Sequence, residues 1–312
     1  MSATNSKKAP KQYPLRDSPF FRIKGKRRFE AVLGVSWDSC EHLSAPEHYR
    51  SWLNANGREI QNPLGWMKHI HHRIADLFSR IQTPDYLHSR KGRSYAGNAA
   101  FHAGSTPLFK TDISKFYPST THAMVYRMFV RDFECDPEVA QRLADICCYQ
   151  KKHVPTGSEL SGRIAFWSAK PMFDKVFALA QSSSCEMTLY VDDIVISGDQ
   201  ATKSLLGQVR QIVSQYGFKT KAKKSITYAA NQAKTVTGVV VVGDELRLPN
   251  SRHRKIWEAR KAYANGSQAE RPTLKAALVG RMREADQILK LNVQNPSACL
   301  ASENPCPVSL AR

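Results

Sequence analysis

The sequence predicts a protein of the α+β class, in which an antiparallel sheet packs on helices. Short runs of β-branched and aromatic residues, bounded by turn residues, predict strands at 108–112 and 189–196. Apolar residues that recur every three or four positions predict helices, most clearly at 64–81. At 312 residues the chain is long enough for one large or two modest domains with an ample core.

The remaining elements are predicted from the same patterns. We expect a helix near 46–53, then a turn at 56–57 followed by a strand that ends near 63. Further helices are expected around 98–102 and at 121–130, 137–149, 161–177 and 203–215. A β-branched strand and turn follow at 234–242, and Gly266 separates two last helices, 251–265 and 272–291.

Two adjacent carboxylates mark the centre of the sequence. Asp192 and Asp193 lie between two short apolar runs, and Gly198-Asp199 supplies a closing turn, so the segment 189–196 predicts a β-hairpin with both acids at its tip. Because successive side chains of a strand point to opposite faces, the two acids do not both bury in one apolar face. Paired carboxylates repel each other unless a cation lies between them.

A third carboxylate, Asp112, ends the strand predicted at 108–112. If the two strands lie side by side, Asp112 meets Asp192 and Asp193. Three carboxylates would then hold two Mg²⁺ ions about 3.5–4 Å apart, an arrangement used for nucleotidyl transfer. An Asp-Asp pair alone would more simply be a solvated turn, and it is the combination with Asp112 that favours a metal site.

These acidic segments resemble the palm of a reverse transcriptase, on the residues Tyr190-Val191-Asp192-Asp193 and Asp112-Ile113-Ser114-Lys115-Phe116-Tyr117. Two further patterns, Asn98-Ala99-x-x-His102 and Val236-Thr237-Gly238, are similar to motifs of bacterial retron reverse transcriptases. The resemblance covers about residues 50–290. It implies a right-hand polymerase fold with fingers, a palm made of an antiparallel sheet packed on helices, and a helical thumb.

The resemblance also implies a division of the chain. We expect a basic flexible arm at 1–28, fingers at 29–105, the palm at 106–235, the Val-Thr-Gly element with the helical thumb at 236–292, and a tail at 293–312. The arm has the alternative of being a plain solvated tail.

The charge of the chain points to a polyanionic partner. The sequence has 46 Lys and Arg against 27 Asp and Glu, a net charge of +19, which favours nucleic acid. No apolar run approaches the roughly 20 residues that span a bilayer, so a membrane partner is not expected, and neither is a signal peptide. The seven cysteines form no C-x-x-C pair and are odd in number, which favours a reducing, cytoplasmic location.

The resemblance implies roles for single residues. It makes Asp112, Asp192, Asp193 and Lys224 catalytic, with Ile113 beside the three acids at the metals. Arg58, Ile113, Tyr117 and Gly157 would bind the incoming nucleotide, with the ring of Tyr117 excluding a 2′-hydroxyl. The alternatives are a solvated Arg58, a core Tyr117 and a Lys224 that is one charge in a basic run. Thr156 stands where the family usually has Gln, which puts ordinary template use in doubt.

A second set of residues is expected to contact RNA. The segment 90–102 combines cations, aromatic rings and glycines, which suits a loop against a nucleic-acid backbone. Asn98 and His102 lie four apart on a helix and face one way, and their alternative role is to hydrogen-bond neighbouring backbone. The basic residues of the thumb would grip template and duplex through phosphates. The full set is Arg90, Lys91, Arg93, Asn98, His102, Arg252, Arg254 and Lys255.

The resemblance therefore implies an RNA-directed DNA polymerase with two Mg²⁺ ions, which copies a dedicated structured noncoding RNA that is both template and primer. Its substrates would be deoxynucleoside triphosphates and its product an RNA–DNA duplex, with an effector protein as a further partner in anti-phage defence. A non-retron defence-associated reverse transcriptase is the alternative that Val191, Thr156 and Lys221 keep open. A non-catalytic RNA-binding scaffold is a third, although the three acids argue against it.

Overall fold

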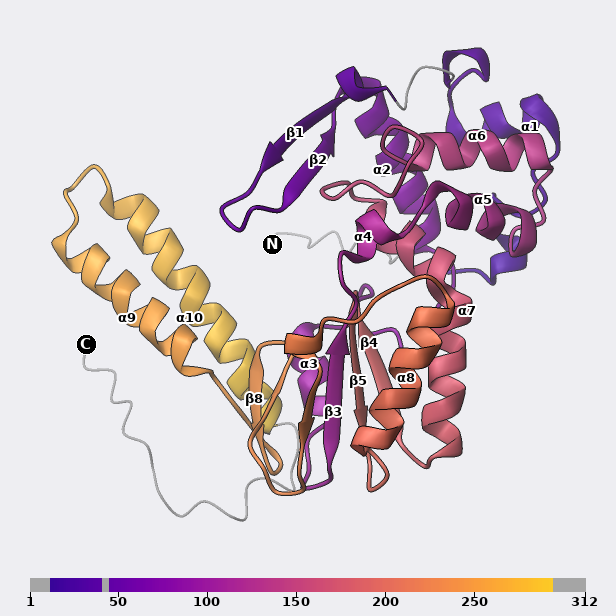
Figure 1. Ribbon diagram of the computed structural model, residues 1–312. Coiled ribbons are helices and arrows are strands. Elements are labelled where there is room, and N and C mark those ends of the chain that lie inside the picture. Colours follow the sequence, from indigo (N-terminus) through magenta and orange to yellow (C-terminus); the bar gives the residue numbers. More distant parts are fainter. Residues whose placement is uncertain (1–11, 41–44, 294–312) are drawn as a thin grey trace, which may run out of the picture. The chain divides into compact units, whose positions relative to one another are not determined.

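The computed structural model describes residues 12–40 and 45–293, and it confirms the α+β class (Figure 1). The chain forms two compact units. In described residues, unit 1 consists of 12–40, 45–87, 113–179 and 208–221, and unit 2 consists of 88–112, 180–207 and 222–293. The units cut across the predicted domains because the chain passes between them several times. The division into fingers, palm and thumb stays a prediction.

The flexible arm predicted at 1–28 is wrong for residues 12–28. Phe20 and Ile23 are fully buried, and Tyr13 forms an isolated bridge to Ile81. Apolar residues within the basic run anchor it to the core of unit 1, so its positive charges lie on a folded segment. Residues 1–11 of that arm and residues 294–312 of the predicted tail lie outside the described residues.

Unit 1 is mainly helical. Its α-helices and strands are α1 (Gly25–Leu33), β1 (Tyr49–Leu53), β2 (Glu59–Pro63), α2 (Gly65–Ser79), α4 (Phe116–Ser119), α5 (His122–Arg131), α6 (Pro137–Cys147), most of α7 (Ser161–Ser182) and the second part of α8 (Lys203–Gln215). Short 3-10 turns lie at Leu15–Asp17, Asp38–Cys40 and Pro46–His48. The helices predicted at 64–81, 121–130, 137–149, 161–177 and 203–215 are confirmed.

An aromatic cluster forms the core of unit 1. The rings of Phe20, Phe78, Phe129 and Phe133 contact one another at centroid distances of 4.9 to 6.4 Å, in tilted or edge-on arrangements. All four side chains are at most 1% exposed. Such pairs add about 0.5–1.5 kcal/mol each beyond the area that they bury. The cluster therefore joins the amino-terminal segment to α2 and α5.

The helix predicted near 46–53 is wrong. Residues 49–53 form β1, which pairs antiparallel with β2 from Tyr49 opposite Pro63 to Leu53 opposite Glu59. Trp52 and Leu53 are 44% and 69% exposed. This hairpin has no apolar face of its own, so the local sequence does not display the alternation that marks a strand.

Unit 2 is built on an antiparallel sheet of four strands in the order β4-β5-β3-β6. These strands are β3 (Leu108–Asp112), β4 (Glu186–Tyr190), β5 (Asp193–Ser197) and β6 (Ile226–Tyr228). A second sheet contains β7 (Lys234–Val236), β8 (Val239–Val242) and β9 (Glu245–Arg247). The hairpin predicted at 189–196 and its pairing with 108–112 are confirmed.

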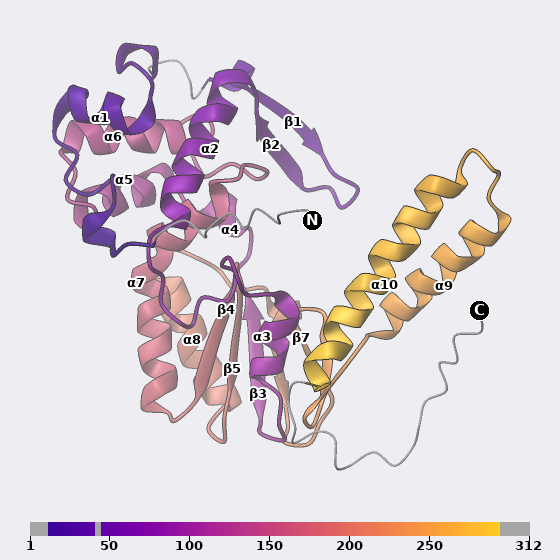
Figure 2. The same ribbon diagram turned by 180° about the vertical axis from the view of Figure 1, so that it is seen from behind.

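The helices of unit 2 cover these sheets and extend from them. In Figure 2, α3 (Tyr95–Phe101) lies in front of the strands, and it contacts β4, β7, β8 and α10. The helices α9 (Asn250–Asn265) and α10 (Arg271–Val293) pack side by side as a pair (Figures 1 and 2). Buried residues of α3, β3, β7–β9 and α10 share one apolar cluster. Within the described segments, every helix is too short or too polar to cross a bilayer.

Candidate active site

The turn between β4 and β5, which leads into the two adjacent acids, contains a strained residue, Val191. Val191 has a φ of +61° although it is β-branched, and its amide donates a hydrogen bond of 3.0 Å to Ser89 Oγ. The amide of His88 donates to the carbonyl of Leu189 at 2.8 Å. A β-branched residue in the left-handed region costs about 1–3 kcal/mol, so the surrounding contacts must hold it there. This support by residues 88–89 could not be predicted from the sequence, because it depends on contacts about 100 positions apart.

The third acid lies beside this turn. Asp112 ends β3 and is the register partner of Asp193, the first residue of β5. Residues opposite each other in an antiparallel pair have Cα atoms about 4.5–5.5 Å apart. The predicted meeting of Asp112 with the acids of the hairpin is therefore confirmed for the backbone. Asp112 is 3% exposed, whereas Asp192 and Asp193 are half-buried.

Lys224 supplies the counter-charge of these acids. It ends a 3-10 turn, η4 (Ala222–Lys224), and its Nζ lies 2.6 Å from Asp112 Oδ2. The hydrogen bond to Asp112 is the largest cause that raises the pKa of Lys224, and the charges of Asp193 and Asp192 raise it further. The ammonium group thus stays protonated beside all three carboxylates. It offsets the repulsion that acids so close together would otherwise suffer.

The acids do not form a ready-made chelate. Among residues 12–40 and 45–293, no group of three His, Cys, Asp or Glu side chains is arranged so that it could hold a metal ion, and the metal site at Asp112, Asp192 and Asp193 stays a prediction. The ammonium group of Lys224 already meets the buried carboxylate of Asp112. The donors themselves are carboxylate oxygens, the type that Mg²⁺ prefers. The residues fit magnesium if Lys224 releases Asp112.

The predicted nucleotide-binding residues belong to unit 1. Arg58 lies in the loop of the β1–β2 hairpin, with its guanidinium 5.8 Å from the centroid of the Tyr117 ring. Tyr117 lies on α4 and is half-buried. The side chain of Ile113 is fully buried, so only its main chain is available to a ligand.

Gly157 occupies a position that only glycine fits. Its φ is +123°, and a Cβ there would lie 2.8 Å from Ile60 Cγ2 and 3.3 Å from the carbonyl oxygen of Gln61. Gln61, which is 1% exposed, binds the same segment twice: its amide donates to the Thr156 carbonyl at 2.6 Å, and its Oε1 accepts from the Thr156 amide at 2.8 Å. The fingers-like hairpin and the loop at 155–158 are therefore joined. Sequence reasoning missed Gln61 because only the fold reveals this contact.

Two residues predicted to contact RNA are buried instead. His102 is 1% exposed, and its ring nitrogens lie 2.7 Å from Ser197 Oγ on β5 and 2.7 Å from Thr188 Oγ1 on β4. Burial, with smaller effects of His88 and Lys234, lowers the pKa of His102 to about 3, so the ring is neutral. Asn98 is 0% exposed. Both side chains therefore face the interior of unit 2, and a direct RNA contact of Asn98 or His102 stays a prediction.

The cations predicted to bind RNA differ in their surroundings. Arg252 forms an ion pair with Glu284 and lies 3.2 Å from the hydroxyl of Tyr95, so it joins α9 to α10 and α3. Arg254 on α9 is mostly exposed and pairs with Glu258 of the next turn. Lys91, Arg93 and Lys255 are exposed, and Arg90 is half-buried. The guanidinium of Arg93 contacts the ring of His88, so Arg93 and Arg252 both have partners within unit 2.

The comparison with protein families identifies the class of this fold and site. A family model described as "Reverse transcriptase (RNA-dependent DNA polymerase)" matches residues 41–241, which is more than half of the 312 residues. The chain belongs to this family, and the resemblance seen in the sequence is confirmed. Its α+β fold is that of the polymerases of this family.

The more particular likeness is to retron enzymes. The chain is 29% identical over 217 residues to Retron Se72 reverse transcriptase of Salmonella heidelberg (strain 579083-10), covering 65% of this chain and 56% of that protein. It is 24% identical over 213 residues to Retron Ec86 reverse transcriptase of Escherichia coli, covering 68% and 64%. Retron Ec73 reverse transcriptase of Escherichia coli is 27% identical over 227 residues, covering 65% and 72%. The match thus spans between about half and two thirds of the first two relatives.

Proposed function

We propose that the protein is an RNA-directed DNA polymerase of the retron type, which copies a dedicated structured noncoding RNA into DNA. The observation that carries the proposal is the register of β3 and β5, which brings Asp112 opposite Asp193 with Lys224 beside them. Family membership and the retron relatives support it. A scaffold that only bound RNA would gain nothing from three carboxylates held next to each other.

The reaction would be the in-line attack of a primer hydroxyl on the α-phosphate of a deoxynucleoside triphosphate. Asp112, Asp192 and Asp193, with the main chain of Ile113, are the groups that would hold two Mg²⁺ ions. Bound there, the ions neutralise phosphate charge and polarise the reacting oxygens. Asp112 would hold a metal only with its carboxylate no longer paired to Lys224, whose ammonium group would then lie beside the site.

Lys224 would then act on the leaving group. Its Nζ carries a proton at neutral pH, and the neighbouring acids raise its pKa further. A cation that holds a proton beside departing pyrophosphate both stabilises its charge and can transfer that proton. Arg58 would bind the triphosphate, and the ring of Tyr117 would exclude a 2′-hydroxyl by steric contact. Gly157 would let the loop at 155–158 pass close to the nucleotide.

Cations on α9 and in the loop before α3 would hold the nucleic acid. Arg254 and Lys255 on α9, with Arg90, Lys91 and Arg93 of the loop before α3, would bind phosphates of template RNA and of the RNA–DNA product. This use of phosphates predicts binding that weakens steeply with salt. We extend the proposal to an effector protein as partner and to a role in anti-phage defence. We also propose a reducing, cytoplasmic location, since Cys147 and Cys148 are both free thiols.

Primer extension with Mg²⁺ and deoxynucleoside triphosphates tests the polymerase activity. We predict that Asp192→Asn abolishes DNA synthesis, because it removes a carboxylate oxygen needed for the metals, while binding to RNA survives. Asp199→Asn is the matched control: Asp199 is exposed beyond the other end of β5, and the same loss of charge there should leave synthesis intact. Full activity of Asp192→Asn would end the assignment of the site.

The nature of the DNA product separates the retron type from its alternative. Priming from an internal 2′-hydroxyl of the RNA gives branched RNA–DNA, whereas a non-retron defence-associated enzyme gives unbranched DNA or repeats. Thr156, where the family usually has Gln, is the residue that favours the alternative, and its side-chain oxygen is buried without a hydrogen-bond partner in the described part of the chain. Sequencing the nucleic acid that copurifies with the protein decides between them.

A further inference from the structure

The carboxyl-terminal end of α8 and the turn after it border two hollows within unit 1. The larger, of about 380 Å³, lies between α5, α7 and residues 215–218. The smaller, of about 290 Å³, lies between the end of α8 and residues 218–220. Phe218 lines both hollows. The larger volume lies near the lower end of the roughly 300–1,000 Å³ of ligand pockets, so it has room for a group the size of one nucleotide.

The lining of the two hollows is cationic. The residues that line them include four cations, Arg127, Arg131, Arg210 and Lys219, and no acid. Arg131 forms an ion pair with its neighbour Asp132, through hydrogen bonds of 2.8 and 2.7 Å. Arg127 donates only through Nε, to the carbonyl of Ala123 at 3.2 Å, and it forms no ion pair within the described residues. Its terminal nitrogens are therefore available to an anion.

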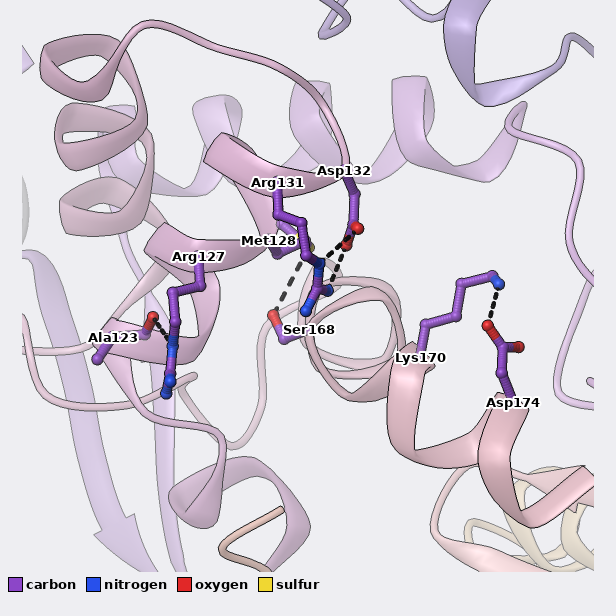
Figure 3. Close-up of polar contacts among 8 residues, drawn as sticks. All are labelled: Ala123, Arg127, Met128, Arg131, Asp132, Ser168, Lys170 and Asp174. Atoms are coloured by element: carbon purple, nitrogen blue, oxygen red, sulfur yellow. Dashed lines mark hydrogen bonds and ion pairs between the residues drawn. The ribbon is translucent and has the colours of Figure 1, made fainter. Parts of the chain in front are cut away.

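Figure 3 shows how these groups are arranged. Arg127 and Arg131 extend from successive turns of α5, and Ser168 of α7 lies next to Arg131. Lys170 instead points away to Asp174, with which it pairs at 2.5 Å. The cations of α5 therefore face the larger hollow, whereas the charge of Lys170 is paired with that of Asp174.

The same hollow has flat and apolar walls beside its cations. Gly217, with a φ of +82°, ends α8 as a left-handed cap and carries Tyr216 and Phe218 on its two sides. Tyr216 is half-buried, and Pro171 and Met124 complete the apolar surface. Ser168 and Gln215 add hydrogen-bonding groups at the wall. A nucleobase stacks on rings and guanidinium planes of this kind, and hydroxyl and amide groups bind its edge or a 2′-hydroxyl.

We propose that the two hollows bind a single-stranded segment of RNA, with one base in the larger hollow and the adjoining phosphates on Arg127 and on Arg210 and Lys219. The inference rests on the proposed function, which supplies an RNA partner, and it adds an anchoring surface made wholly of unit 1. None of its residues belongs to the acids, Lys224 or the nucleotide-binding set. An acidic protein segment would match the charge, but it would leave the flat walls of the larger hollow without a ring to stack on them.

The test is binding of a fluorescein-labelled single-stranded oligouridylate of about 12 nucleotides to the full chain, followed by anisotropy. Arg127→Glu and Arg210→Glu should each weaken binding by about tenfold and reduce the slope of log K against log salt by about one, because each removes a phosphate contact. Lys175→Glu is the matched control, since Lys175 is exposed on α7 and lines neither hollow. A 4-thiouridine probe should crosslink to the peptide that contains Tyr216, and Tyr216→Leu should remove that crosslink.

Two results would overturn the proposal. One is equal binding by Arg127→Glu, Arg210→Glu and Lys175→Glu, with crosslinks outside residues 124–131, 168–171 and 210–220. The other is binding of a polyglutamate peptide, and not of the oligouridylate, in a manner that depends on Arg127. Extension of a DNA primer annealed beforehand to a short RNA template is measured on the same proteins and should be unchanged. Loss of extension in the wild type would refute the polymerase, whereas normal extension without the crosslink would refute only the anchoring surface.

Discussion

Acidification should destabilise unit 2 through His102. Its neutral ring joins β4 and β5 by hydrogen bonds of 2.7 Å to Thr188 and Ser197. Burial lowers its pKa from the ordinary 6.5 to about 3. Below pH 6.5, His102 is protonated in the unfolded chain, whereas in the folded chain it stays neutral down to about pH 3. The free energy of unfolding therefore falls as the pH falls through this range. At about pH 5, 1.5 units below the unfolded value, the loss is about 2 kcal/mol, since each unit is worth about 1.36 kcal/mol.

The assay compares urea unfolding at about pH 7.5 and about pH 5 for the wild type and for His102→Gln, whose amide does not titrate. The free energy lost on acidification should be smaller in the variant by about 2 kcal/mol, whatever its absolute stability. Contributions of other groups, including the buried His71, cancel because they are present in both proteins. His253→Gln on α9, an exposed position, should behave as the wild type does. An identical loss in wild type and His102→Gln would refute the reasoning.

Two further substitutions test the positions around the nucleotide. Gly157→Ala should destabilise the protein by about 1–3 kcal/mol and raise the KM for deoxynucleotides, because its Cβ would meet Ile60 while φ stays at +123°. Gly207→Ala in α8, where a Cβ meets nothing within 4 Å, should instead stabilise the protein by up to about 1 kcal/mol. Equal melting temperatures of the two variants would contradict both expectations. Lys224→Met should lower kcat of primer extension by about 100-fold, and it should also lower stability, because it leaves the buried carboxylate of Asp112 without its ammonium partner. An unchanged kcat would exclude Lys224 from the chemistry.

The β4–β5 hairpin could be predicted because its signal is local. The segment 189–196 has strand-forming residues on both sides of two acids, and such a pattern leaves few alternatives. The strand at 108–112 has the same kind of signal, and the assumption that it lies next to the hairpin gave the observed pairing of Asp112 with Asp193. The helices with clear apolar periodicity were predictable for the same reason, because the residues that form their buried face all lie within one continuous stretch of sequence.

The errors occurred where distant contacts decide the structure. β1 is a strand because β2 pairs with all five of its residues, and nothing in 46–53 itself indicates that partner. The amino-terminal segment reads as a basic arm because charged residues surround Phe20, whose ring packs on residues more than 50 positions away. Lys224 was predicted at the site, but its pairing with Asp112 depends on a contact 112 positions apart.

The motifs that mark the retron likeness support the β4–β5 hairpin, which carries Asp192 and Asp193, from within unit 2. His102 bonds to both strands that flank the acids, and Thr237 Oγ1 donates to the carbonyl of Tyr95 at 2.6 Å, at the start of the same helix α3. Lys234 Nζ donates to the carbonyls of residues 104 and 106, which follow α3. Arg252 of α9 pairs with Glu284 of α10 and contacts the hydroxyl of Tyr95, so it joins the two helices to the start of α3. Since α3 contacts β4, β7, β8 and α10, the two motifs join the strands that flank the acids to the α9–α10 pair within unit 2. The burial of Asn98 and His102 fits this structural role.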